Sequence, residues 1–171
     1  VDDSMNDVPH DGKTMGEIVA RGNVVMQGYY NDPQATATAF RGGYFHSGDA
    51  AVVHPDGYVE IRDRYKDVII SGGENISSIE VEGALLAHPA VLEVAVVGMP
   101  HEKWGESPHA FVVLKTGMNL TSDELRQYAR GVLAHFKVPT AFSFVDSLPK
   151  TATGKIQKYV LRGGKAAIAR Q

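Results

Sequence analysis

A serine, a glycine and a carboxylate stand together at Ser47-Gly48-Asp49, a grouping suited to holding a sugar. An ionised carboxylate only accepts hydrogen bonds, so an aspartate fixed at the start of a strand can accept from both hydroxyls of a ribose diol. Taken alone, such a tripeptide is more often a turn in which the aspartate bonds its own backbone. The sugar-binding interpretation gains weight because Arg64 follows 15 residues after Asp49, with one predicted hairpin between them.

Residues 148–156, Leu-Pro-Lys-Thr-Ala-Thr-Gly-Lys-Ile, combine small hydroxyl side chains, a glycine and two lysines. Gly154 and its neighbours favour a mobile loop, and Lys155 places a compact positive charge on a long stem. The segment is not a phosphate-binding P-loop, because Ile156 follows the lysine and no glycine stands five residues before Gly154. A flexible surface loop is the alternative. The segment alone therefore predicts a mobile cation but not its task.

A third segment, from residue 63 to residue 78, passes from charged to apolar residues and then to a glycine turn. Residues 63–66 are charged or polar, residues 68–70 form a short apolar strand, and Gly72-Gly73 makes a turn before a helix capped by Ser77 or Ser78. By itself such a charged run is most often a solvated turn. Here it falls between two segments that each predict packed structure, which favours a hinge.

The elements before this hinge should bring the candidate sugar-binding residues together. We expect a strand at 17–20, and a helix at 34–40 that Asp32 caps and Pro33 begins. Residues 50–54 and 58–62 read as two strands joined by the turn Pro55-Asp56-Gly57. Because Asp49 and Arg64 lie at the two open ends of this hairpin, they should be close in space.

After the hinge, the sequence predicts a mixture of helices and strands. We expect helices at 78–87 and from Thr121 onward, the second with a capping box and an apolar stripe of period 3.6. Strands are expected at 91–98, 110–114 and 142–145, with a loop at 99–109, and a last helix or tail at 159–169.

Composition limits the class of protein. The 171 residues are 43% hydrophobic and 22% charged, which is ordinary for a globular protein, and the net charge of -3 gives no reason to expect nucleic acid as a partner. No cysteine is present, so disulfides and thiolate zinc sites are excluded and a cytoplasmic location is expected. The seven histidines show no i, i+4 pairing, so we expect no metal site. The chain starts at Val1 in a polar stretch, which suggests a piece of a longer protein.

Taken together and in order, these motifs resemble the adenylate-forming acyl-CoA synthetases, a superfamily that includes luciferases and the adenylation domains of peptide synthetases. The segment Asp-Arg-Tyr-Lys-Asp at 63–67 is similar to the family's hinge motif, and Pro-Lys-Thr-Ala-Thr-Gly-Lys at 149–155 to its catalytic lysine motif. Phe-Lys-Val-Pro at 136–139 and Trp-Gly-Glu at 104–106 also match. Two departures are Asp63, where many relatives have glycine, and Ile70, where some have a lysine. The second puts one charged contact during thioester formation in doubt.

The resemblance implies a role for each candidate residue. Asp49 and Arg64 would bind the ribose of the nucleotide, Lys66 would be the pivot of the hinge, and Lys155 would be the catalytic lysine. Gly72-Gly73 would let the pantetheine arm of coenzyme A pass close to the backbone, since no Cβ blocks it.

The family reaction implied has two halves. A carboxylate attacks the α-phosphorus of ATP to give an acyl-adenylate and pyrophosphate, and the thiol of coenzyme A then displaces AMP. The substrate would be a fatty or related acid. ATP would arrive with Mg²⁺, which residues outside this chain would mostly hold. The phosphate loop, adenine slot and acyl pocket would lie upstream, so this chain alone is expected to be a poor catalyst.

The expected fold is α+β, a small C-terminal domain with a mixed sheet flanked by helices, preceded by the last β-rich strands of a larger N-terminal domain. Residues 1–63 would end that large domain, 64–66 would be the hinge, and 67–171 the mobile C-terminal lid domain. The partners would be the missing N-terminal domain, the acid, ATP and coenzyme A, with a homo-oligomer as a further option. Two other functions stay open: loading of a carrier-protein thiol, and a non-catalytic nucleotide- or protein-binding module.

Overall fold

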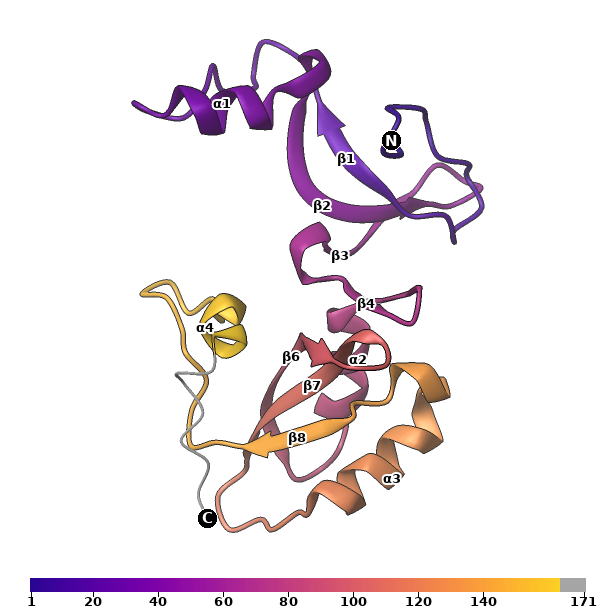
Figure 1. The fold of residues 1–171 in the computed structure, drawn as a ribbon, viewed down its shortest axis with the longest axis vertical. Coiled ribbons are helices and arrows are strands. Elements are labelled where there is room, and N and C mark those ends of the chain that lie inside the picture. Colours follow the sequence, from indigo (N-terminus) through magenta and orange to yellow (C-terminus); the bar gives the residue numbers. More distant parts are fainter. Residues whose placement is uncertain (164–171) are drawn as a thin grey trace. The chain divides into compact units, whose positions relative to one another are not determined.

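The chain folds into two compact units, which are shown in Figure 1. A computed structural model describes residues 1–163. The first unit is Val1–Lys66 and the second begins at Asp67. The boundary falls inside η2, a single 3-10 turn at Tyr65–Asp67. The assignment of these units to a large domain, a hinge and a lid stays a prediction.

The first unit is a three-stranded antiparallel sheet in the order β1-β2-β3. Helix α1 and the 3-10 helix η1 connect β1 to β2. Asp32 caps α1 through a 2.8 Å hydrogen bond that its Oδ1 accepts from the amide of Ala35, as the sequence predicted. The bounds are β1 Gly16–Ala20, α1 Pro33–Ala39, η1 Arg41–Gly43, β2 Phe45–Val53 and β3 Val59–Arg64.

Both strands of the predicted hairpin are longer than expected. Strand β2 begins at Phe45, so Asp49 lies inside a strand and not just before one, and β3 continues to Arg64. Strand β2 begins earlier because it pairs with β1, which opposes Ala20 to Phe45, and β3 runs on because Arg64 pairs with Asp49. Gly48 has φ +74°, a conformation that glycine adopts without strain and that sequence reasoning treats as the end of a strand.

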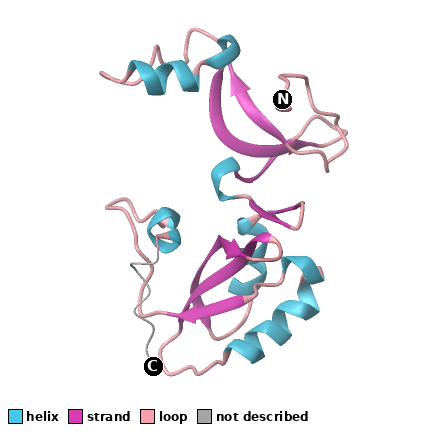
Figure 2. Ribbon diagram, in the orientation of Figure 1, coloured by secondary structure: helices cyan, strands magenta, loops and turns pink. Residues whose placement is uncertain are grey.

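The second unit is built on a mixed sheet in the order β5-β4-β7-β6, coloured magenta in Figure 2. All neighbours in this order are antiparallel, whereas β8 pairs with β7 in parallel. The strands are β4 Ile69–Ser71, β5 Glu74–Ile76, β6 Val91–His101, β7 Gly105–Leu114 and β8 Ala141–Phe144; the helices are α2 Ser78–Leu86, α3 Ser122–Val132, η3 His135–Lys137 and α4 Lys158–Arg162. The predicted α+β fold with a mixed sheet flanked by helices is confirmed.

Two parts of the second unit differ from expectation. The predicted loop at 99–109 is mostly strand, because β6 runs on to His101 and β7 begins at Gly105. Pro100 argues against a strand in general, but β6 is at the edge of the sheet, where a missing amide is tolerated. Strand β5 was not predicted. Of the last predicted helix, α4 is present, and residues 164–169 lie outside the described residues.

Strands β6 and β7 bury both of their faces, since alternate side chains of each strand belong to two separate apolar clusters. On β6, Val94 and Val96 pack with α2 and α3, whereas Ala95 and Val97 pack with Leu161 of α4. Helices α2 and α3 therefore cover one face of the sheet and α4 covers the other. No helix within residues 1–163 has the length and apolar character needed to cross a membrane.

Candidate functional site

Asp49 and Arg64 meet across the β2–β3 ladder. They are register partners, and Arg64 Nε lies 3.3 Å from Asp49 Oδ1. The side chains are 28% and 57% exposed respectively, so both are open to a ligand. No hydrogen bond from the described residues reaches the other carboxylate oxygen, Oδ2. The predicted convergence is confirmed, and the pair offers a guanidinium beside a carboxylate with a free acceptor.

A network that sequence reasoning missed holds the backbone next to Asp49. Glu17 Oε1 accepts a 3.0 Å hydrogen bond from the amide of Gly48, and Glu17 Oε2 lies 2.7 Å from His46 Nδ1 and 2.8 Å from Arg41 Nη2. Burial alone would raise the pKa of Glu17, but the bonds from His46 and Gly48 and the charges of His46 and Arg41 outweigh it and lower that pKa.

His46 is the buried centre of this network. Its second ring nitrogen, Nε2, lies 3.1 Å from the carbonyl oxygen of Arg41. A neutral imidazole carries one N–H, so both contacts are hydrogen bonds only when the ring is protonated. The residues come from β1, η1 and β2, and only the pairing of β1 with β2 brings them together, so no local sequence signal marks them.

Ser47 supports Asp49 from the other side. Its hydroxyl donates to the carbonyl of Ile18 at 2.8 Å and accepts from the amide of Asp49 at 3.1 Å. The serine of the Ser-Gly-Asp motif is therefore a structural tie between β1 and β2. The site-forming role falls to Asp49.

Lys66 is the last residue of the first unit and lies exposed in η2. Its side chain forms no ion pair with any residue in 1–163. This position is compatible with a pivot, whose role stays a prediction.

The segment that carries Lys155 is a hydrogen-bonded turn, and the mobility expected from its composition stays a prediction. Lys150 and Ile156 form an isolated antiparallel bridge. Inside it, the Thr151 amide donates to the Lys155 carbonyl at 2.8 Å, and the Lys155 amide donates to the Thr151 hydroxyl at 3.1 Å. Gly154 takes φ +85° at the tip. These bonds fix the backbone from which Lys155 projects.

Lys155 differs from the lysines on either side of its turn. Lys150 Nζ pairs with Glu93 at 2.6 Å and Lys158 Nζ pairs with Glu82 at 2.7 Å. Lys155 is exposed, and its ammonium forms no ion pair or hydrogen bond within the described part of the chain. Its charge is therefore available to a ligand.

Gly72 and Gly73 form the two-residue turn between β4 and β5, with φ values of +60° and +88°. Two consecutive left-handed residues are what a type I′ hairpin turn requires, so glycine is favoured at both. A Cβ on Gly72 would lie 2.9 Å from the ring of Trp104, whereas one on Gly73 would meet nothing within 4 Å. The absent side chain at Gly72 thus makes room for Trp104.

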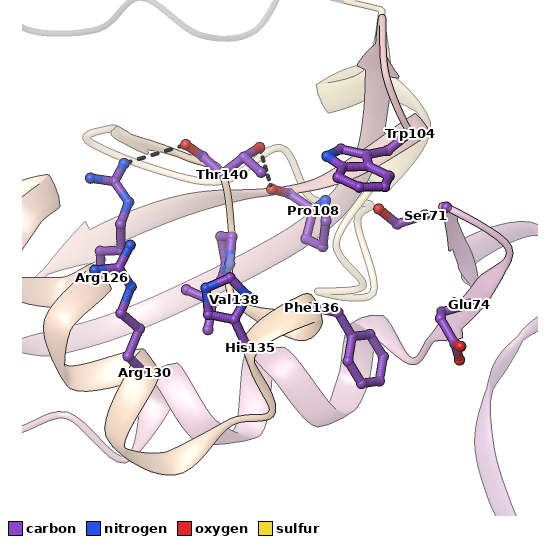
Figure 3. A pocket seen from close by; sticks show the side chains of 12 residues that line it. Ser71, Glu74, Trp104, Pro108, Arg126, Arg130, His135, Phe136, Val138 and Thr140 are labelled. Carbon is purple, nitrogen blue, oxygen red and sulfur yellow. Dashed lines mark hydrogen bonds between the residues drawn. The ribbon is translucent and has the colours of Figure 1, made fainter.

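A cavity of about 470 Å³ opens beside this turn, and Figure 3 shows its lining. Trp104 and Phe136, each 45% exposed, present aromatic surface, and Pro108 and Val138 add to the apolar lining. The cationic side chains of Arg126 and Arg130 on α3 also line it (Figure 3). The cavity suits a slender, mostly apolar ligand with a charged end.

No group of three or more His, Cys, Asp or Glu side chains that could hold a metal ion occurs in residues 1–163. The candidate site residues are a partly exposed carboxylate and an exposed guanidinium in the first unit, and an unpaired lysine and an aromatic cavity in the described part of the second.

Comparisons with known proteins show which family this chain resembles. Residues 80–155 match the AMP-binding enzyme C-terminal domain family. The chain is 59% identical over 158 residues to a probable CoA ligase of Humulus lupulus, covering 91% of this chain and 28% of that protein. It is 56% identical over 164 residues to an acetate–CoA ligase of the same organism, covering 93% of this chain and 29% of that protein. The chain thus spans less than a third of the length of these relatives.

A solved structure has the same fold. ATP-bound MatB from Rhodopseudomonas palustris superposes with a TM-score of 0.87 at 36% identity, over 95% of this chain and 32% of that one. The chain therefore belongs to the adenylate-forming, AMP-binding enzyme family, and it corresponds to the C-terminal portion of the members of that family.

Proposed function

We propose that this chain is the C-terminal portion of an ATP-dependent acid–thiol ligase, which joins a carboxylic acid to coenzyme A through an acyl-adenylate. The observation that carries the proposal is the state of Lys155, a free ammonium on a closed turn between two lysines that are both ion-paired. The names of the two plant relatives, both CoA ligases, favour coenzyme A over a carrier protein as the thiol acceptor.

In the first half-reaction, a carboxylate oxygen of the acid attacks the α-phosphorus of ATP and the bond to pyrophosphate breaks. Negative charge is redistributed over the phosphate oxygens, and the ammonium of Lys155 stabilises it. Asp49 Oδ2 accepts from the ribose hydroxyls, and the neighbouring guanidinium of Arg64 donates to the same nucleotide. The network around Glu17 keeps the backbone beside Asp49 in place.

In the second half-reaction, the thiol sulfur of coenzyme A attacks the acyl carbon and AMP leaves. The cavity beside Gly72, with its volume of about 470 Å³ and its aromatic lining, is the proposed place for the pantetheine arm, and its arginines suit the phosphates of coenzyme A. This step needs Lys155 withdrawn, for which a rotation at Lys66 is the proposed means.

Mg²⁺ accompanies ATP in this proposal, but residues 1–163 contain no ligand set for it. The proposed substrate is a fatty or related carboxylic acid, and one of the two relatives is named for acetate. The cytoplasmic location stays a prediction.

The proposal is tested with the intact protein that contains this chain, incubated with ATP, Mg²⁺ and a series of linear acids. Release of pyrophosphate that depends on the acid, followed by formation of acyl-CoA only when coenzyme A is added, is the expected result. Hydrolysis of ATP to ADP, or ATP binding with no dependence on any acid, would contradict it and favour a non-catalytic module.

A further inference from the structure

We infer that Lys158 and Arg162 are positioning residues for Lys155, which fix its turn to α2 and to the first residue of the second unit. This inference rests on the proposed function of Lys155. The catalytic lysine motif at 149–155 does not include these two residues. The inference is drawn from their contacts within the second unit.

Lys158 is the centre of a compact polar network. Its Nζ lies 2.7 Å from Glu82 Oε1 and 2.5 Å from Ser78 Oγ, so it joins α4 to the first and second turns of α2. The same Glu82 oxygen accepts a 2.8 Å hydrogen bond from the amide of Val96 on the edge strand β6. One carboxylate thus holds a helix, a strand edge and the residue three positions after Lys155.

The burial of this pair sets it apart from a surface ion pair. The side chains of Lys158 and Glu82 are 14% and 20% exposed, whereas those of Lys150 and Glu93 are 39% and 34% exposed. Removing one partner of a half-buried pair leaves the other charge without compensation, so the local structure must rearrange. Loss of the network at Lys158 should therefore disturb the position of the Lys155 turn more than loss of the Lys150–Glu93 pair.

Arg162 makes the second connection. Its Nη2 lies 2.6 Å from Oδ1 of Asp67, a buried carboxylate at the first position of the second unit. Asp67 directly follows Lys66, the proposed pivot. The helix that follows the Lys155 turn is thereby tied to the residue through which any rotation at Lys66 would reach the second unit.

Apolar contacts complete the attachment on both sides of the turn. Leu148 before it and Leu161 after it are buried in one cluster with Val97 and Phe111, and Ile156 packs against the same cluster. The turn itself has no apolar residue in this cluster. The position of the turn therefore depends on the residues before and after it. Among these, the polar network of Lys158 fixes the orientation of the turn, because its hydrogen bonds are directional.

A displacement of about 1 Å at a reacting group can lower the rate roughly 100-fold, so loosening this turn should act on the step that uses Lys155. In the intact ligase, we expect Lys158→Met to lower the rate of adenylation roughly 10- to 100-fold. Thioester formation from preformed acyl-adenylate should change less than about twofold, because Lys155 is withdrawn in that step. Lys158→Arg, which keeps the charge and the donors, should restore most of the adenylation rate.

The matched control is Lys137→Met. It removes the 2.6 Å pair of Lys137 with Glu80, which also ends on α2 but starts from η3 and not from α4. Hydrogen exchange of peptides covering 150–157 gives a readout besides activity. Lys158→Met should speed exchange of the bonded amides of Thr151, Gly154 and Lys155, and Lys137→Met should not.

Lys155→Ala, measured in parallel, separates the inference from the proposed function. If Lys155→Ala leaves adenylation unchanged, the proposed role of Lys155 fails. If Lys155→Ala abolishes adenylation while Lys158→Met matches Lys137→Met, or lowers both half-reactions alike, only the positioning role is overturned. Should Lys158→Met fail to fold, the nearly isosteric Glu82→Gln decides: loss confined to adenylation supports the inference and an unchanged rate overturns it.

Discussion

Arg64 Nε lies 3.3 Å from Asp49 Oδ1, and the two residues are direct partners across the β2–β3 ladder. The contact uses one carboxylate oxygen and leaves the other open. Sequence and structure thus agree that the carboxylate of Asp49 and the guanidinium of Arg64 lie side by side and form one small polar site.

If the site formed by Asp49 and Arg64 binds the ribose, Asp49→Ala should raise the KM for ATP. A hydrogen bond to a charged group is worth about 1.5 to 3 kcal/mol, so the increase should be roughly 10- to 100-fold. Asp49→Asn separates the effect of charge from that of side-chain size, because it keeps the size of the side chain and loses the charge. Unchanged ATP affinity in Asp49→Ala would remove the ribose assignment.

The hinge should separate the two half-reactions. Lys66→Pro fixes φ near about -65° and removes an amide, which should hinder rotation at this residue. Adenylation, followed by pyrophosphate exchange, should survive better than thioester formation. Lys66→Ala keeps the backbone free and should impair both half-reactions less than Lys66→Pro does. Equal loss of both half-reactions in Lys66→Pro would count against a pivot.

The two glycines of the β4–β5 turn form a matched pair. Alanine at either is strained by a positive φ, but only at Gly72 would the new Cβ also meet Trp104, at 2.9 Å. Both variants should therefore lose stability by roughly 1 kcal/mol or more, whereas Gly72→Ala alone should displace Trp104 and raise the KM for coenzyme A. Thermal melts and thioester kinetics distinguish the two effects. Equal KM values in the two variants would argue against the cavity as the site of the pantetheine arm.

How far the sequence could lead depends on how local each feature is. The meeting of Asp49 with Arg64 was predictable because one tight turn joins their strands. The start of β2 at Phe45 was not, because it depends on pairing with β1, and neither was the network of Glu17 with His46. The cavity joins Gly72 to Trp104 and Phe136, and no periodicity in the chain encodes that meeting. The hydrogen bonds that close the turn around Lys155 were not predictable either, because glycine and threonine content does not reveal bonds between side chain and backbone.

Acid should weaken the second unit through His109. Burial lowers the pKa of this residue from its ordinary 6.5, and its Nε2 lies 2.9 Å from the Ser143 hydroxyl on β8. The unfolded chain therefore binds a proton at a higher pH than the folded chain does. Stability is complete above the unfolded pKa and falls as the pH drops through it toward the folded pKa.

Denaturant unfolding between about pH 8 and about pH 5 measures this effect. His109→Gln keeps a hydrogen-bonding group toward Ser143 and does not titrate, so its stability should fall less steeply over this range. Parallel curves for the two proteins would show that His109 does not couple folding to pH.

If Lys155 acts in adenylation alone, Lys155→Ala in the intact ligase must affect the two half-reactions differently. Removing one preorganised charge opposite a developing oxyanion costs roughly 100- to 1,000-fold in rate, so acid-dependent pyrophosphate exchange should fall by at least about 100-fold. With preformed acyl-adenylate and coenzyme A, the same variant should still form thioester at close to the wild-type rate. Full adenylation activity, or equal loss of both half-reactions in a folded variant, would show that Lys155 does not have this role.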